Sequence, residues 1–263
     1  MEVPGAGRNK FFVLWSEMVG TAFLLLAVNW GGTSSHTPLC VGLTVAVMAQ
    51  MFGSISGGHF NPAVTVGMMI KHRHDDVPFG IVYGEVIMLF QFIGAAFGCI
   101  LSAGAMVFLP QDDKELPAPG SHYITQLCPR FGCNDGGKMV FKVFLVEAVM
   151  TAFFVTFVLQ IVKTNGAKDM PVNGLAIGLA LYACIQIASG ISGGAINPAV
   201  GLVQTIFQRV FNGHAYPKTT PQHVTYMPIY LISPFIGGIF GGLVQRWLVE
   251  PAMNRKEKAA QNS

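Results

Sequence analysis

The stretch ISGGHFNPAV at residues 55–64 recurs as ISGGAINPAV at residues 191–200, and the two copies differ only at their fifth and sixth letters. A match of this quality within one chain indicates an internal repeat. A second echo lies upstream of each copy, because EMVGTAF at 17–23 is similar to EAVMTAF at 147–153. The chain therefore consists of two related halves.

The sequence around these copies is strongly apolar. The 263 residues are 52% hydrophobic and 11% charged, whereas an average soluble domain has roughly 25% charged residues. About 20 apolar residues in a helix cross the hydrocarbon core of a bilayer, and such a stretch pairs its backbone groups in lipid by being helical. We therefore predict an all-α integral membrane protein with six transmembrane helices, at 11–30, 39–55, 81–108, 139–162, 171–190 and 228–249.

Each half contains three of these spans, and an odd number gives the two halves opposite orientations in the membrane. Inverted repeats of this kind commonly place a transport site where they meet, near the bilayer midplane. We predict a single domain over residues 1–263, with a first repeat at 11–108, a linker loop at 109–138, a second repeat at 139–250 and a cytoplasmic tail at 251–263.

The Asn-Pro-Ala triplet in each copy predicts the start of a short helix. Asn is a preferred N-cap, and Pro suits the first helical position because its missing N–H would have no partner there. The apolar residues that follow, about 62–70 and 198–208, would give helices of roughly 14–16 Å, or half a bilayer. We expect two half-helices that meet by their N-termini, with a pore built around Asn61, Pro62, Ala63, Asn197, Pro198 and Ala199.

Two facing helix N-termini concentrate partial positive charge at the centre of the membrane. Cations would be repelled there, while Asn61 and Asn197 would still donate amide hydrogens to a neutral solute. The paired glycines before each triplet would let the loop backbone approach closely and line the lumen with its carbonyl groups. The motifs therefore predict a pore that passes neutral solutes.

These residues resemble the aquaporin, or major intrinsic protein, family, and the resemblance covers almost the whole chain. QFIGA at 91–95 and SPFIGG at 233–238 are similar to that family's packing signatures. The segment 55–64 is most similar to the ammonia-permeable aquaporins of animals and the tonoplast-type aquaporins of plants. The resemblance implies an aquaporin-like fold, homotetramers with one pore in each protomer, and the exclusion of protons and cations by half-helix dipoles that is established for aquaporins.

Carried over from the family, the four selectivity-filter positions are Val41, Ile185, Gly194 and Val200. Most relatives have Arg where Val200 stands, and many have His or an aromatic residue where Val41 stands. The Ile, the small residue and the Val at the last three positions resemble the filter of some tonoplast-type aquaporins, which supports ammonia, hydrogen peroxide or urea as permeants beside water. Glycerol channels usually have Asp where Gly201 stands, so a dedicated glycerol role is less favoured.

Two acidic residues, Glu17 and Glu147, fall inside predicted spans, where ionisable side chains usually have a function. The resemblance implies that they support the re-entrant loops by accepting backbone N–H groups, and direct contact with the permeant is the less favoured alternative. Two interpretations of His59 stay open: a pore-lining or pH-sensing group, and a loop histidine held by the backbone.

The distribution of basic residues predicts the orientation. Short cytoplasmic loops collect Lys and Arg, and with the N-terminus inside, the inner segments hold most of the 16 Lys and Arg residues. Both termini are therefore predicted on the cytoplasmic side of the plasma membrane or of an organelle membrane. Cys128 and Cys133 share the linker loop, where a disulfide and two unlinked thiols are both compatible with the sequence.

Together these features predict a passive channel for water and small neutral solutes, and not an enzyme. We expect no cofactor, no metal site and no nucleic-acid partner; the partners would be the permeants, the lipid bilayer and other copies of the chain. The alternative is a poorly conducting aquaporin-derived scaffold or a subunit of a larger membrane complex, since a wide apolar constriction can exclude water by dewetting. A proton-coupled carrier is less supported, because the spans hold few ionisable residues besides Glu17 and Glu147.

Overall fold

The structure is a computed structural model of the chain. It describes residues 9–31, 36–71, 81–107, 127, 137–165, 170–212 and 226–254. Cys128, Cys133 and most of the predicted linker loop lie outside the described residues, so their state stays a prediction.

The described chain is helical, and six of its helices are long and apolar enough to cross a membrane. In the first repeat these are α1 (Lys10–Trp30), α2 (Thr37–Ser56) and α4 (Ile81–Val107), with the short α3 (Pro62–Lys71) between α2 and α4. In the second repeat they are α5 (Val140–Asn165), α6 (Met170–Ser189) and α9 (Met227–Val244), with the short α7 (Pro198–Phe207) between α6 and α9. Two π-helices continue the chain, η2 (Gln208–Asn212) after α7 and η3 (Gln245–Val249) after α9.

The predicted all-α fold with six spans and two half-helices is confirmed, and the described residues contain no strand. The largest difference lies at the end of the second repeat. The last span continues to Asn254, past the predicted end of the repeat at 250 and into the predicted tail. The reason is a π-type turn after α9. In this turn the Glu250 N–H bonds to the Gln245 carbonyl, and the helix continues past the apolar residues of the span.

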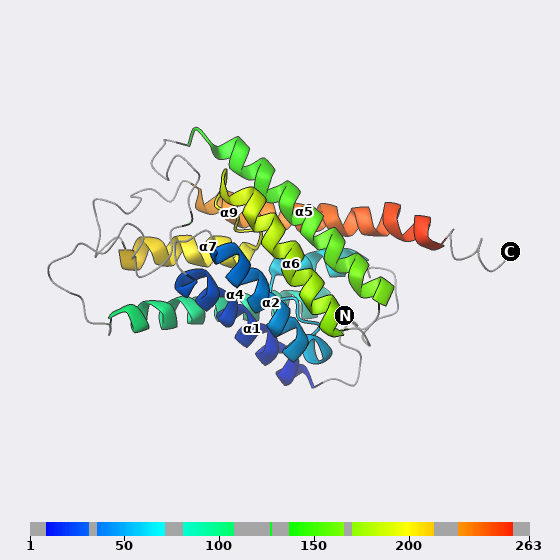
Figure 1. The fold of residues 1–263 in the computed structure, drawn as a ribbon, viewed down its shortest axis with the longest axis horizontal. Coiled ribbons are helices and arrows are strands. Elements are labelled where there is room, and N and C mark those ends of the chain that lie inside the picture. The colour runs from blue at the N-terminus through cyan, green and yellow to red at the C-terminus, as the bar shows by residue number, and fades with distance from the viewer. Residues whose placement is uncertain are drawn as a thin grey trace.

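The helices pair in the same way in both repeats. α1 packs mainly against α4, and α5 packs mainly against α9, while α2 and α6 contact one another and join the repeats. The half-helices α3 and α7 each contact both α4 and α9. In Figure 1, α7 lies to the left of the centre of the bundle and the cyan α3 to its right. The two half-helices therefore approach the centre from opposite sides.

Glycines bring the paired helices close together at equivalent places. A Cβ atom at Gly94 on α4 would collide with the carbonyl oxygen of Met18 on α1, and a Cβ atom at Gly237 on α9 would collide with that of Ala148 on α5. Met18 and Ala148 occupy the same position of the repeated segment. The internal repeat therefore extends to the packing of the bundle.

We expect Gly94→Ala to destabilise the protein by about 1–3 kcal/mol, the usual cost of inserting atoms into a packed interior. The matched control is Gly104→Ala on the same helix, because a Cβ atom at Gly104 meets nothing within 4 Å. Thermal unfolding in detergent measures both variants. A melting temperature for Gly94→Ala that equals that of Gly104→Ala would contradict the close approach of α1 and α4.

Candidate functional site

The two half-helices begin at their predicted caps. The Asn61 Oδ1 accepts the Ala63 backbone N–H at 2.8 Å, and the Asn197 Oδ1 accepts the Ala199 N–H at 2.9 Å. The proline after each Asn sits at the first helical position, where no N–H is needed. Because the side-chain oxygen of each Asn binds its own helix, each side-chain NH₂ group is directed elsewhere.

Those NH₂ groups connect the two repeats. The Asn61 Nδ2 donates to the Ile196 carbonyl at 2.9 Å, and the Asn197 Nδ2 donates to the Phe60 carbonyl at 2.9 Å. Each Asn therefore binds the residue that precedes the other Asn. Since an amide carries two hydrogens, each of these reciprocal bonds leaves a second hydrogen on the same nitrogen. The six predicted residues of the two triplets are thus brought together, at the junction of α3 and α7.

Glu17 on α1 lies behind the first loop and is fully buried. Its Oε1 accepts the Ser56 hydroxyl at 2.7 Å and the His59 N–H at 2.9 Å, and its Oε2 accepts the Phe60 N–H at 2.7 Å. Gln91 on α4 donates a further bond to Oε2 at 2.8 Å. One carboxylate therefore pairs two consecutive loop amides that no helix satisfies.

Glu147 on α5 occupies the equivalent place behind the second loop and is also fully buried. Its Oε1 accepts the Ser192 hydroxyl at 2.6 Å and the Ala195 N–H at 3.0 Å, and its Oε2 accepts the Ile196 N–H at 2.7 Å. The Tyr230 hydroxyl donates to the Ser192 carbonyl from α9. Glu17 and Glu147 bind the two loops in the same way. The additional bonds differ, since they come from Gln91 on α4 in the first repeat and from Tyr230 on α9 in the second.

The loop backbone has an uncommon conformation that these bonds maintain. Phe60 has φ 47° and Ile196 has φ 52°, in the left-handed region that side chains other than glycine rarely adopt. The N–H groups of both residues are bound by a glutamate, and their carbonyls accept the Asn amides of the opposite repeat. Bonds on both sides of each residue therefore fix this strained backbone.

His59 is buried and has a protein partner. Its Nδ1 lies 3.1 Å from the Thr65 hydroxyl, which the Gln91 Nε2 binds at 3.0 Å. Its backbone N–H is held by Glu17. These contacts favour the interpretation of His59 as a loop histidine held within the protein.

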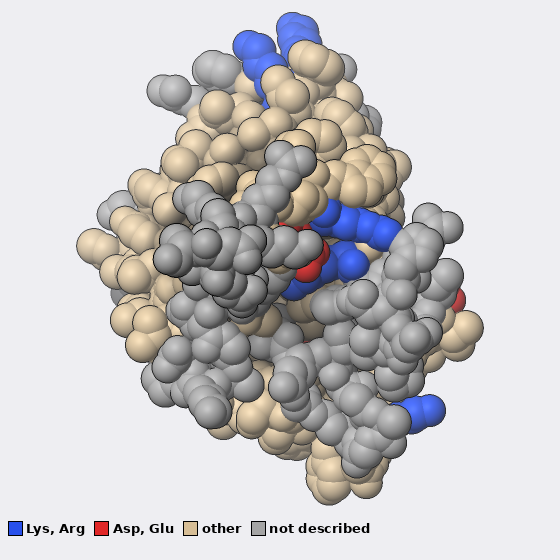
Figure 2. Space-filling model, turned by 90° about the vertical axis from the view of Figure 1, so that its right-hand side faces the viewer, with Lys and Arg blue, Asp and Glu red and all other residues tan. Residues whose placement is uncertain are grey.

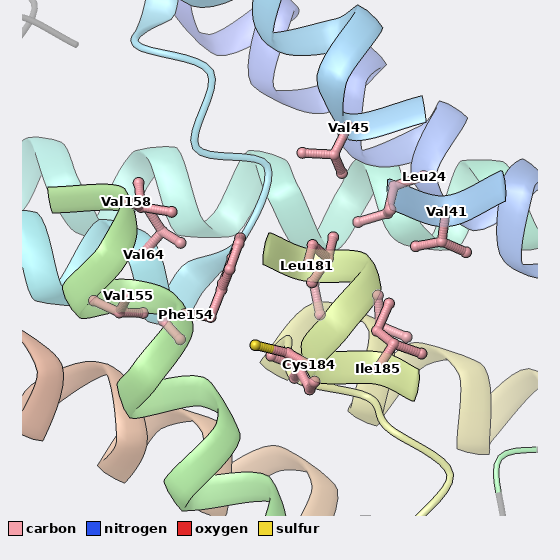
Figure 3. Close-up of a cluster of buried hydrophobic side chains, with 14 of the residues drawn as sticks. Leu24, Val41, Val45, Val64, Phe154, Val155, Val158, Leu181, Cys184 and Ile185 are labelled. Atoms are coloured by element: carbon pink, nitrogen blue, oxygen red, sulfur yellow. The ribbon is translucent and has the colours of Figure 1, made fainter. Parts of the chain in front are cut away.

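The three predicted filter positions that carry a side chain are buried in the bundle. Val41, Ile185 and Val200 are 5%, 9% and 6% exposed and belong to one cluster of buried apolar side chains. In Figure 3, Val41 on α2 and Ile185 on α6 point toward one another. A Cβ atom at Gly194 would lie 3.1 Å from the Ile185 carbonyl oxygen, so a side chain at Gly194 would crowd this place. The side chains of this group are aliphatic and small.

Leu127 is a described residue of the linker that the sequence analysis did not single out. Leu127 is 7% exposed and packs in a cluster with Ala195, Tyr226 and Tyr230. Its backbone N–H donates to the Gln208 Oε1 at 2.8 Å. The linker is therefore tied to η2, beside the loop that carries the second triplet.

Basic side chains hold the far end of α3. The Arg246 Nη1 donates to the Ile70 carbonyl at 3.1 Å, and the Lys71 Nζ lies 3.5 Å from the Leu159 carbonyl. The Ile70 carbonyl lies in the last turn of α3, where positive charge is favourable. Figure 2 looks onto the end of the bundle that is at the right in Figure 1, and Lys and Arg side chains gather near the middle of that face.

The sequence model of the family described as "Major intrinsic protein" matches residues 9–245. The chain belongs to the major intrinsic protein family. It is 30% identical over 228 residues to the glycerol uptake facilitator protein-like 6 of Lactiplantibacillus plantarum, which covers 87% of this chain and 90% of that protein. It is also 30% identical over 234 residues to aquaporin Z of Photorhabdus laumondii, which covers 89% of each chain.

A solved structure is similar in fold. The aquaglyceroporin from Plasmodium falciparum superposes with a TM-score of 0.69, at 20% sequence identity, over 94% of this chain and 99% of that one. The family and the six apolar helices identify the chain as a multi-pass integral membrane channel of the water and small-solute class, and not an enzyme. Within the described residues, no three His, Cys, Asp or Glu side chains gather in a way that could hold a metal ion.

Proposed function

We propose that this channel conducts water and small neutral solutes passively and excludes protons and cations where α3 and α7 meet. The observation that carries the proposal is the reciprocal pair of bonds from the Asn61 and Asn197 amides, which directs two helix N-termini and two donor groups at one point. Positive helix ends disfavour a cation there, while a neutral solute exchanges its hydrogen bonds with the second amide hydrogens.

The four filter positions would select by size and by apolar contact. Val41, Ile185, Gly194 and Val200 offer no fixed charge and no side-chain donor. Ammonia, hydrogen peroxide and urea are proposed as permeants beside water, and the relative named for glycerol uptake makes glycerol a solute to include in the assay. We propose that Glu17 and Glu147 act as loop supports, since they bind the loop N–H groups in the interior of the bundle.

We propose a homotetramer with both termini on the cytoplasmic side. The Lys71 and Arg246 side chains at the end of the bundle where η3 lies support this orientation, because positive charge collects on the cytoplasmic side of membranes.

Purified protein in liposomes tests the function. Stopped-flow light scattering should give an osmotic water permeability well above that of protein-free vesicles, followed by measurable uptake of ammonia, urea and glycerol. A water permeability equal to that of protein-free vesicles would contradict the channel proposal and favour the poorly conducting scaffold. Cross-linking of the same preparation measures the oligomer.

We expect Asn197→Asp to raise the cation leak roughly tenfold, equal to a barrier lower by about 1.4 kcal/mol. A carboxylate at this position places negative charge at the positive end of α7 and loses the donor to the Phe60 carbonyl. Asn197→Ser is the matched control, because a serine oxygen can still cap α7 while the amide donor is lost and no charge is added. Proton and sodium flux into liposomes measure the leak; equal leaks from the two variants would contradict an electrostatic barrier at this point.

A further inference from the structure

An aromatic side chain breaks the symmetry of the two repeats in the interior of the bundle. Phe154 lies two helical turns after Glu147 on α5, and Leu24 lies two turns after Glu17 on α1, so they occupy equivalent positions. Both side chains are 3% exposed and belong to the same buried apolar cluster. The second repeat therefore inserts a ring where the first has a smaller aliphatic group.

The ring lies beside the start of the first half-helix. In Figure 3 it extends from α5 into the region between Val64 on α3 and Leu181 on α6, which belong to the same cluster. α5 contacts both α3 and α6. Val64 is in the first turn of α3, directly after the triplet whose Asn61 binds the opposite loop. Phe154 is therefore placed close to the junction of the half-helices.

The ring is larger than any side chain at the four filter positions, which are Val, Ile, Gly and Val. A phenyl ring is planar and rigid, so it cannot become smaller by changing its conformation. The interior around it is close-packed, so the ring has little room to move aside. The narrowest apolar passage is then expected near Phe154 and not at the aliphatic filter positions.

We propose that Phe154 sets the size limit of the permeant, as a second constriction near the junction of α3 and α7. This inference rests on the proposed channel function. Water and ammonia pass the ring, whereas the larger urea and glycerol are slowed by it. Selection by size is therefore assigned to α5 of the second repeat, in addition to the four filter positions.

Phe154→Leu tests the proposal, since it gives the second repeat the residue that the first repeat has at Leu24. The glycerol-to-water and urea-to-water permeability ratios should rise roughly threefold or more, equal to a barrier lower by about 0.7 kcal/mol. Phe153→Leu is the matched control: the same substitution on the neighbouring residue of α5, whose side chain is 59% exposed on the outside of the bundle. Its ratios should equal those of the unmodified protein.

A second variant keeps the proposal testable if Phe154→Leu does not fold. Phe154→Met keeps most of the volume but is flexible, and its glycerol-to-water and urea-to-water permeability ratios should exceed those of the unmodified protein. Water flux in all variants with unchanged solute ratios would overturn the constriction and leave the channel function standing. Water flux no higher than in protein-free vesicles, for the unmodified protein and every variant, would overturn both.

Discussion

Replacing Glu147 by Gln should lower the melting temperature by roughly 5 °C or more and remove most of the water flux. The two carboxylate oxygens of Glu147 accept three donors, from the Ser192 hydroxyl and the Ala195 and Ile196 backbone amides. A Gln side chain offers one acceptor oxygen, so its NH₂ group must face at least one of those donors. A lost bond to a charged acceptor costs about 1.5–3 kcal/mol.

The loss of flux follows from the position of the unsupported loop. Ile196 has a left-handed backbone conformation, and its carbonyl accepts the Asn61 amide of the other repeat. If its N–H loses its acceptor, the loop relaxes and its carbonyl no longer meets the Asn61 amide, so the junction of the half-helices loses the geometry that passes water. Thermal unfolding and stopped-flow scattering measure the two effects.

Glu85→Gln is the control for this substitution. Glu85 lies on α4 with its side chain exposed, so the same chemical change touches no buried donor. The support role assigned to Glu147 would be wrong if Glu147→Gln folded, melted and conducted water like Glu85→Gln.

The sequence was sufficient for the parts of the fold that depend on neighbouring residues. Apolar runs of membrane-spanning length located six helices, and each Asn-Pro pair located the start of a half-helix, because capping and the missing proline N–H act within one turn. The inverted repeat also predicted that Asn61 and Asn197 would meet. It did not predict that each amide binds the carbonyl before the other Asn, since that depends on where two loops far apart in the chain come to rest.

Contacts made by packing were missed for the same reason. Gln91 was noted only as part of a packing signature, yet it binds both the Glu17 carboxylate and the Thr65 hydroxyl. Tyr230, which binds the Ser192 carbonyl, was not noted at all. The unequal pair Leu24 and Phe154 is visible once the repeats are aligned. Its burial in the interior became known only from the three-dimensional arrangement.

Replacing Val200 by Arg should lower the permeability of urea, glycerol and ammonia relative to water, by roughly tenfold for glycerol. Val200 lies in the first turn of α7, is 6% exposed, and shares the buried cluster with Val41 and Ile185. An Arg side chain would bring five N–H donors and a permanent charge to this place. The passage at the four filter positions would become narrower than the passage beside Phe154. The constriction at residue 200 would then set the size limit of the permeant.

Val210→Arg is the matched control. Val210 lies in η2 with its side chain 55% exposed, so the same substitution there adds the same charge outside the buried cluster.

The double variant Val200→Arg with Phe154→Leu adds a further test. Two constrictions act in series, so enlarging the wider one should change little, and the double variant should retain the low solute ratios of Val200→Arg. If Val200→Arg instead leaves the solute-to-water ratio unchanged while Phe154→Leu raises it, Val200 does not face the lumen. Selection by size would then depend on the aromatic ring of the second repeat alone.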